Sequence, residues 1–339
     1  MRVEPKPSFA FLVVTYNHQE YILEHLESIK YLVDAYGGGM DVDVIINDDC
    51  SRDQTRALVD RWLDVNAKIF RQVKTIYNSK NLGTCASVNN LLTHMVAERC
   101  KLTAGDDVYS YENIFELTKH DINVAMVSGR ALYLMDGLLD IDKRSNILTT
   151  ATQVIYENDS LIHRFKHFSY NNAPNIQYST ECLLHPLVRE QLRNYDVVED
   201  WPLQVAISRQ FPKYQFKLID EILVYYRRTT GSTYVVASER FKKDKNKLYD
   251  DLINNECNWF ERLRLKSRKS CFSMNGRIKR IITNLDAYFF GFSMLMRLPK
   301  IVAINSTLKF DVDRHQDHYA KISRSARSFF ESEVEKTLP

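Results

Sequence analysis

The chain has 339 residues, of which 45% are hydrophobic and 12% aromatic, and this excludes an intrinsically disordered protein. Its net charge is only +3, which argues against the strongly basic surface of a nucleic-acid-binding protein, so we expect no nucleic-acid partner. The charge is uneven, because residues 240–280 hold 13 Lys and Arg against 5 Asp and Glu, a net +8. One end of the protein is therefore predicted to carry a basic face.

The cysteines and the apolar runs predict a reduced, cytoplasmic protein. No two cysteines have CxxC spacing, which favours free thiols over a disulfide framework. A strand begins near Phe9, so we expect no signal peptide before it. The longest uncharged late run, 287–296, is about half as long as a membrane-spanning helix must be.

In the first 128 residues, short apolar runs typical of strands alternate with segments whose apolar residues have helical spacing. Alternation of this kind indicates βαβ units and an α/β fold with a mostly parallel sheet covered by helices on both faces. Ligands of such sheets bind outside the carboxyl ends of the strands. We predict strands at 9–15, 42–47, 73–77, 101–103 and 123–128, with helices at 19–32, 53–65, 84–96 and 113–119 between them.

The pattern of the second half is less regular. Residues 177–184 are predicted to form a strand, 200–210 a helix and 216–226 a further extended stretch. Basic helical segments follow. We therefore predict a catalytic domain at 1–234 and a mainly helical, basic C-terminal region at 235–339.

Polar residues follow each of the first four predicted strands. Any one set has an ordinary interpretation as a helix cap, a turn or a solvated acidic pair. Two acidic pairs at one sheet edge repel each other, however, unless a cation or a hydrogen-bonding ligand lies between them. The sets are Thr15-Tyr16-Asn17, Asp48-Asp49, Asn81-Leu82-Gly83 and Asp106-Asp107.

These motifs together resemble family 2 of the inverting glycosyltransferases, which have the GT-A fold. The resemblance covers about residues 8 to 234. It implies a nucleotide-sugar donor, most often UDP-linked, an acceptor hydroxyl on a glycan or a lipid-linked sugar, and one Mn²⁺ or Mg²⁺ ion. The matching segments are 13–17 (VVTYN), 48–55 (DDCSRDQT), 81–83 (NLG) with Asn89, 105–107 (GDD) and 199–201 (EDW).

The resemblance also implies roles for single residues. Tyr16 would stack on the nucleotide base, and Asp48 would accept a hydrogen bond from it. Asp106 would bind the metal, and Asp200 would be the catalytic base. Thr15, Asn17, Asn81 and Asp107 complete the expected nucleotide-binding set. The sequence departs from the family at Ala104, which stands where the family's metal motif often begins with Asp.

Three parts of the sequence each have a second interpretation. Asp200 precedes Trp201 at a predicted helix start, so it has a second interpretation as a helix cap. Arg227 and Arg228 follow the last extended stretch, and they form either a loop that closes over the diphosphate or an ordinary basic turn. Basic and aromatic residues of 262–300 suit peripheral contact with the inner face of the cell membrane, or packing on the catalytic domain or another subunit.

The predicted function is metal-dependent, inverting transfer of a sugar in surface polysaccharide, capsule or lipopolysaccharide synthesis, the pathway resting on family analogy. The alternative is a non-catalytic nucleotide-sugar or glycan-binding protein on the same fold, which Ala104 supports. A nucleotidyltransferase would have a glycine-rich, basic loop after the first strand, and residues 15–18 do not form one.

Overall fold

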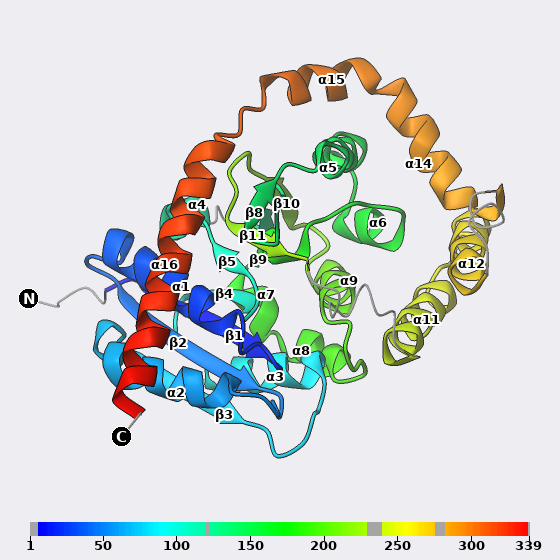
Figure 1. The fold of residues 1–339 in the computed structure, drawn as a ribbon. Coiled ribbons are helices and arrows are strands. Elements are labelled where there is room, and N and C mark those ends of the chain that lie inside the picture. The colour runs from blue at the N-terminus through cyan, green and yellow to red at the C-terminus, as the bar shows by residue number, and fades with distance from the viewer. Residues whose placement is uncertain (1–5, 120–122, 229–238, 275–281, 338–339) are drawn as a thin grey trace, which may run out of the picture.

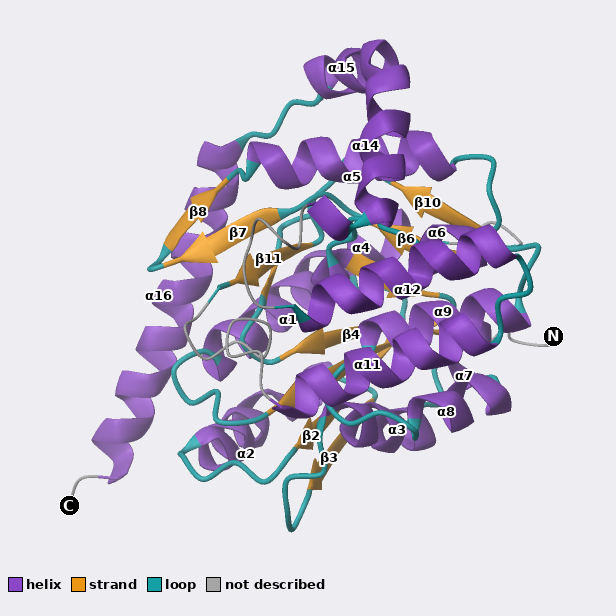
Figure 2. Ribbon diagram, turned by 90° about the vertical axis from the view of Figure 1, so that its right-hand side faces the viewer, coloured by secondary structure: helices purple, strands orange, loops and turns teal. Residues whose placement is uncertain are grey.

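A computed structural model describes residues 6–119, 123–228, 239–274 and 282–337. A parallel sheet of order β3-β2-β1-β4 lies at its centre. Three helices join these strands and cover both faces of the sheet, which confirms the α/β fold predicted from the sequence (Figures 1 and 2). The elements are β1 (Ser8–Thr15), α1 (Ile22–Tyr36), β2 (Asp41–Asp48), α2 (Thr55–Asn66), β3 (Gln72–Tyr77), α3 (Thr84–His94) and β4 (Arg99–Ala104).

Strand β1 shows how the sequence covers both faces of the sheet. Successive side chains of a strand point to opposite faces. Phe9 and Phe11 pack with α1 and α2, whereas Ala10 and Leu12 pack with α3. All four residues are fully buried, which explains why this strand is a continuous apolar run.

The strand order places a topological switch point between β1 and β4. From β1 the chain adds β2 and then β3 on one side, and it returns to add β4 on the other side of β1. The connections after β1 and β4 therefore leave the sheet in different directions, which opens space for a ligand at the carboxyl ends of these strands. The polar motifs at residues 15–17 and 105–107 follow these two strands.

Two smaller sheets extend the molecule beyond β4. Their orders are β10-β6-β9 and β5-β11-β7-β8, and each mixes parallel and antiparallel pairs. Lys101 joins β4 to the segment around β9, because its fully buried Nζ donates to the carbonyl oxygens of Leu102, Pro174 and Ile176 at 2.8–2.9 Å. The strands are β5 (Val108–Tyr109), β6 (Val124–Ser128), β7 (Leu132–Met135), β8 (Leu138–Asp140), β9 (Ile176–Tyr178), β10 (Gln215–Leu218) and β11 (Val224–Arg227).

The strand predicted at 177–184 is wrong over most of its length. It ends at Tyr178, and α7 begins at Thr180. The backbone N–H of Ser179 still donates to Ala125 of β6, and the carbonyl of Ser179 then accepts from Leu183 and closes a helical turn. The helices of this part are α4 (Ile114–Leu117), α5 (Lys143–Tyr156), α6 (Leu161–Lys166), α7 (Thr180–Leu184), α8 (Pro186–Leu192) and α9 (Asp200–Gln210), with 3₁₀ turns at Ala67–Ile69 and Ala173–Asn175.

The C-terminal helices form an arc around one side of the molecule, coloured yellow to orange in Figure 1. The last helix, in red, then returns to pack on α1. Leu248 and Leu252 of the first C-terminal helix are buried in the same cluster as Leu203 of α9. The predicted boundary after residue 234 thus divides the sequence, whereas one hydrophobic core joins its two parts. These helices are α11 (Glu239–Asn254), α12 (Trp259–Ser273), α14 (Leu285–Met296), α15 (Leu298–Thr307) and α16 (Val312–Thr337).

Among the described residues, no single helix is long and apolar enough to cross a membrane. Helices α14 and α15 reach that length and composition only together, and the chain bends by 72° between them.

Candidate active site

The ends of β1 and β2 are tied together by Asn17. Its backbone has a left-handed φ of 55°, its N–H donates to Oγ of Ser51 at 2.8 Å, and its Oδ1 accepts from the N–H of Arg52 at 2.9 Å. These bonds turn the chain sharply after β1. The preceding residue, Tyr16, remains 40% exposed. An exposed aromatic ring at the strand switch point can stack on a planar ligand.

The end of β1 also touches the end of β4. Thr15 is fully buried, and its Oγ1 has no hydrogen-bond partner among the described residues. A Cβ added to Gly105 would lie 3.2 Å from this oxygen and 2.9 Å from a methyl group of Ile22. Gly105 is therefore required by the close approach of the two strand ends.

Asp48 ends β2 with one carboxylate oxygen engaged and one free. Oδ1 accepts from the N–H of Ser51 at 2.9 Å and forms an ion pair with Nε of Arg56 at 2.5 Å. Oδ2 is buried and has no partner among the described residues. A buried acceptor without a donor costs free energy, so this oxygen is suited to accept an N–H from a ligand.

Asp49 directly follows Asp48, and the sequence predicts no binding or catalytic role for it. Its carboxylate accepts hydrogen bonds from the backbone N–H groups of Leu82 and Gly83, at 2.7 and 2.8 Å. It thereby shapes the turn that carries Asn81. The Asn81 side chain donates to the carbonyl of Asp49 and accepts from Arg240 at 2.8 Å. Asn81 is therefore held at the site by groups on both sides.

The two acidic residues after β4 have different environments. Asp107 is 2% exposed, and its Oδ1 accepts the backbone N–H of Arg227 at 2.9 Å. Burial, with the neighbouring charge of Asp106, raises the pKa of Asp107 well above its usual range. The Asp106 carboxylate is half-buried and forms no hydrogen bond or ion pair with any described residue. Asp106 is thus the one of the pair that is free to bind a cation.

The two arginines predicted at the diphosphate lie apart. Arg227 is 7% exposed, donates from Nε to the carbonyl of Asp106 at 2.6 Å, and forms an ion pair with Glu24 of α1. Arg228 is exposed, and its guanidinium lies 3.5 Å from the ring centre of Tyr133. Arg227 therefore supports the backbone at Asp106, whereas Arg228 is accessible. The rest of the predicted loop lies outside the described residues.

Asp200 is the first residue of α9, as the sequence predicts. Its Oδ1 accepts the N–H of Trp201 at 2.7 Å, so it also takes part in starting the helix. The preceding Glu199 makes no capping hydrogen bond, and burial together with the charge of Asp200 raises the pKa of Glu199 to about 8. At neutral pH the Glu199 carboxyl is therefore mostly protonated.

Helix α11 holds the loop that leads into Asp200. Oδ2 of Asp244 accepts three successive backbone N–H groups, those of residues 196, 197 and 198, at 2.7–3.1 Å. Arg240 pairs with both carboxylate oxygens of Asp196 at 2.6 Å. No local pattern in the sequence indicates these roles, because the residues of α11 are recognisable only as part of the basic region. The contacts show that the C-terminal region positions both Asn81 and Asp200.

We expect Asp244→Ala to lower kcat by about 10-fold and the free energy of unfolding by about 2–4 kcal/mol. The change removes three charge-assisted hydrogen bonds from the loop before Asp200, while donor-contacting residues stay unchanged. Steady-state kinetics and urea denaturation would measure both effects. The matched control is Asp250→Ala on the same helix, where an exposed ion pair with Lys269 is lost at little cost. Equal effects of the two changes would contradict the assignment.

The structure therefore brings Thr15, Tyr16, Asp48 and Asp106 to one edge of the sheet, around the switch between β1 and β4. Parallel strands with a switch point, flanking helices and this set of acidic and aromatic residues are the features that the resemblance to the GT-A glycosyltransferases implies. Residues 10–182, just over half of the chain, match glycosyl transferase family 2. The chain belongs to this family and is a glycosyltransferase.

Solved structures support the same fold. The chain superposes on residues 1–349 of TarS from S. aureus, in complex with UDP-GlcNAc, with a TM-score of 0.51 and 15% identity, covering 95% of this chain and 92% of TarS 1–349. It also superposes on the mannosyltransferase PcManGT from Pyrobaculum calidifontis, in complex with GDP-Man and Mn²⁺, with a TM-score of 0.52 and 14% identity, covering 96% and 88% of the two chains. Among curated proteins, no sequence matches.

Proposed function

We propose that the chain transfers a sugar from a UDP-linked donor to a hydroxyl of a glycan or a lipid-linked acceptor, with inversion at the anomeric carbon. Two observations at the carboxyl ends of the paired strands β1 and β2 carry this proposal: the buried Oδ2 of Asp48 has no partner among the described residues, and the ring of Tyr16 is exposed. An acceptor oxygen next to a stacking ring suits the imide N–H of uracil. A crystal structure of TarS contains UDP-GlcNAc and a structure of PcManGT contains GDP-Man, which supports a nucleotide-sugar donor.

The donor set at β4 fits a hard divalent cation. Asp106 offers a carboxylate with no partner among the described residues, and no Cys or His side chain follows β4 at residues 104–107. Oxygen ligands suit Mn²⁺ or Mg²⁺. In this proposal Asp106 holds the ion, which neutralises charge on the departing diphosphate. Asp107 is engaged by the backbone of Arg227 and supports the turn instead.

In the proposed reaction Asp200 takes the proton of the acceptor hydroxyl as that oxygen attacks the anomeric carbon. Glu199, neutral at pH 7, does not compete for this proton. A single displacement inverts the anomeric centre, so no side chain has to form a covalent intermediate. Arg228 is accessible for contact with the diphosphate. By family analogy we assign the activity to bacterial surface polysaccharide, capsule or lipopolysaccharide synthesis.

Calorimetric titration with UDP and GDP, each with and without Mn²⁺, tests the donor assignment. We expect UDP to bind with Mn²⁺ present and GDP to bind at least 10-fold more weakly, because guanine presents two adjacent donors, N1–H and the 2-amino group, whereas only Oδ2 of Asp48 is free to accept. The control is UDP without metal. Preference for GDP would refute the assignment of Asp48 to uracil. Binding of neither nucleotide would favour the non-catalytic alternative.

We further propose that the turn from α14 to α15 contacts an anionic membrane surface, where a lipid-linked acceptor would lie. Phe292, Leu295 and Met296 are 63–65% exposed, and Val302 on α15 is 56% exposed. Arg297 lies exposed between the two helices. Apolar side chains beside a cation are the composition that favours the interface of an anionic bilayer.

Co-sedimentation with liposomes tests this contact. We expect the protein to bind vesicles that contain anionic lipid, and the double change Phe292→Ser and Leu295→Ser to weaken binding at least 10-fold through lost apolar burial. Val96→Ser is the matched control, because Val96 is 69% exposed on another part of the molecule. Equal binding of all three proteins, or a dimer formed through this turn, would contradict the proposal.

A further inference from the structure

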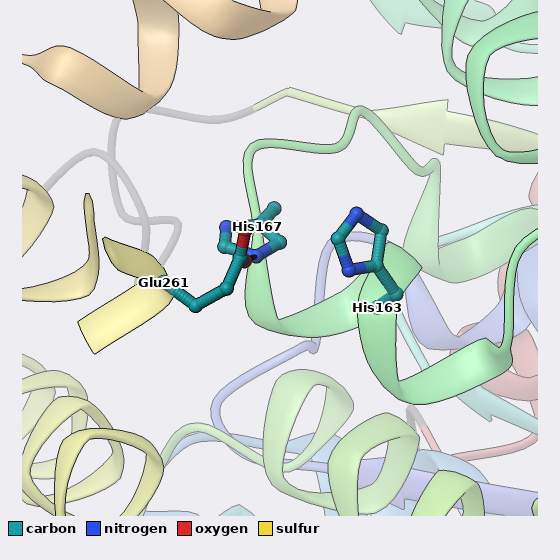
Figure 3. A group of neighbouring side chains, drawn as sticks. All are labelled: His163, His167 and Glu261. Carbon is teal, nitrogen blue, oxygen red and sulfur yellow. Dashed lines mark ion pairs between the residues drawn. The ribbon is translucent and has the colours of Figure 1, made fainter. Parts of the chain in front are cut away.

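A second group of metal-ligating side chains lies between α6 and α12. His163 and His167 are four residues apart at α6, and Glu261 reaches them from the first turn of α12 (Figure 3). One ligand atom from each of the three residues lies within 4.8 Å of the others. None of these residues belongs to the site at the ends of the strands. The two elements that carry them come from the two parts of the sequence on either side of residue 234.

The imidazole of His167 is oriented by a buried carboxylate. Its Nδ1 lies 2.9 Å from Oδ1 of Asp286, and both side chains are fully buried. Asp286 also accepts hydrogen bonds from Arg264 at 2.7 Å and from the N–H of Phe168 at 2.6 Å. A carboxylate paired in this way accepts only, so Nδ1 of His167 carries the proton and donates it.

This orientation points the other nitrogen of His167 at a second acceptor. When the ring is neutral, Nε2 has a lone pair, and it faces Oε2 of Glu261 in an ion-pair contact. Apart from this contact, neither atom has a hydrogen-bond partner among the described residues. Two acceptors that face each other this closely are held either by a proton on the ring or, after moving about 1 Å apart, by a shared metal ion.

The surroundings favour a cation held by all three side chains. Asp159 lies 3.9 Å from Nε2 of His163, so a further carboxylate is within reach. Among the described residues, the ion pairs of this group connect four carboxylates with three cationic side chains and the two imidazoles. The carboxylates are Asp159, Glu256, Glu261 and Asp286, and the cations are Lys166, Arg264 and Arg268.

We propose that His163, His167 and Glu261 bind one Zn²⁺ ion, with water or Asp159 in the fourth position. Two imidazoles and one carboxylate form a donor set that suits Zn²⁺, whereas the oxygen-only site at Asp106 suits Mn²⁺ or Mg²⁺. The hydrogen bond from His167 to Asp286 is the carboxylate–histidine arrangement that orients metal-bound imidazoles. The protein then holds two metal ions of different chemistry.

The position of the site gives the ion a structural role. Phe165, between the two histidines, accepts a hydrogen bond from Nε1 of Trp201 at 2.7 Å, and Trp201 follows Asp200. Arg268 of α12 donates to the carbonyl of Lys166 at 3.1 Å. An ion bound to both α6 and α12 therefore joins the C-terminal arc to the segment that supports Asp200.

Metal binding is tested in the full chain with Asp106→Ala as the background, because this change removes the carboxylate of the other metal site. We expect about one zinc per chain by elemental analysis after gel filtration, and visible d–d absorption of a tetrahedral ion after loading with Co²⁺. Zinc should raise the thermal unfolding midpoint, and a chelator should lower it again.

His163→Ala is the test variant, because His163 is half-buried and its loss leaves the buried contacts of His167 and Asp286 in place. We expect its zinc affinity to fall about 100-fold and the chelator to have no effect on its unfolding midpoint. Glu261→Gln should also lose zinc. The control is His94→Ala, which removes an exposed imidazole of α3.

Two results would overturn the proposal. The first is a folded background protein that binds no zinc, which would mean that the imidazole of His167 alone bridges the carboxyl groups of Glu261 and Asp286. The second is zinc binding that His163→Ala and His94→Ala affect equally. Because nucleotide binding is measured separately with wild type, either result leaves the transferase assignment unaffected.

Discussion

Asp200→Asn is expected to lower kcat by about 10³-fold and to leave the dissociation constant of the donor nearly unchanged. An amide cannot accept the proton of the acceptor hydroxyl. Its oxygen can still accept the N–H of Trp201, as Asp200 does at 2.7 Å, so the start of α9 is preserved. Steady-state transfer assays with calorimetric titration of the donor separate the two quantities. Retained transfer would leave Asp200 as a helix-capping residue only.

Glu199→Gln is the matched control, because it changes the adjacent carboxyl to an amide. The raised pKa of Glu199 means that this group is already neutral at pH 7, so we expect kcat to change less than 10-fold. An inactive Glu199→Gln protein with an active Asp200→Asn protein would exchange the two roles.

The pH dependence of stability in the wild type and in Glu199→Gln gives a second test of the raised pKa of Glu199. The pKa of Glu199 is higher in the folded protein than in the unfolded chain, so its protonation stabilises the fold at low pH. This contribution is lost as the pH rises from the ordinary range of glutamic acid through about 8. Thermal unfolding midpoints should therefore fall more steeply over this range in the wild type than in Glu199→Gln.

Asp106→Ala is expected to weaken Mn²⁺-dependent binding of UDP by about 100-fold and to abolish measurable transfer. The Asp106 carboxylate has no protein partner among the described residues, so its removal should cost little stability. Titration of UDP with and without Mn²⁺ measures the metal-dependent part directly, and thermal unfolding shows whether the fold is unchanged.

Asp107→Asn is the control for this change. Its amide oxygen can still accept the N–H of Arg227, as the carboxyl does at 2.9 Å, and the pKa of Asp107 is raised by its burial. We therefore expect metal-dependent binding of UDP to persist in Asp107→Asn. If this variant loses that binding while Asp106→Ala keeps it, the metal ligand is Asp107.

Ala104 does not decide between catalysis and binding. It ends β4 and is half-buried, where the family's motif often has an acidic residue. Membership of the family follows from the match over residues 10–182, and the reaction that we propose needs a metal ligand and a base, for which Asp106 and Asp200 are the candidates. The missing carboxylate predicts weaker metal binding than two acidic ligands would give.

Much of the fold was predictable from local sequence. The apolar run at 9–15 and the helical spacing in 19–32 describe single elements, and each element's periodicity reports the face that it buries. Polar residues at the ends of successive parallel strands meet at one sheet edge, so the motifs at Asp48 and Asp106 could be placed together before any contact was known. The helix predicted at 200–210 has the bounds of α9.

Contacts between distant elements were not predictable in this way. Arg240 and Asp244 act on residues 44 to 159 positions earlier in the chain, and nothing in their own helix indicates which loop they contact. The different environments of Asp106 and Asp107 depend on Arg227, more than a hundred residues away. The group of His163, His167 and Glu261 exists only because side chains of α12 reach α6.

The sequence by itself thus determined the parallel sheet, the edge at which we expect a ligand and the acidic and aromatic side chains that follow the strands there. These features depend on hydrophobic periodicity and on residues at strand ends, which are properties of short segments. The tertiary structure alone decided which carboxyl groups have a raised pKa, which accept hydrogen bonds from the protein and which are left to bind a ligand. Burial and pairing arise from elements that meet only when the whole chain has packed.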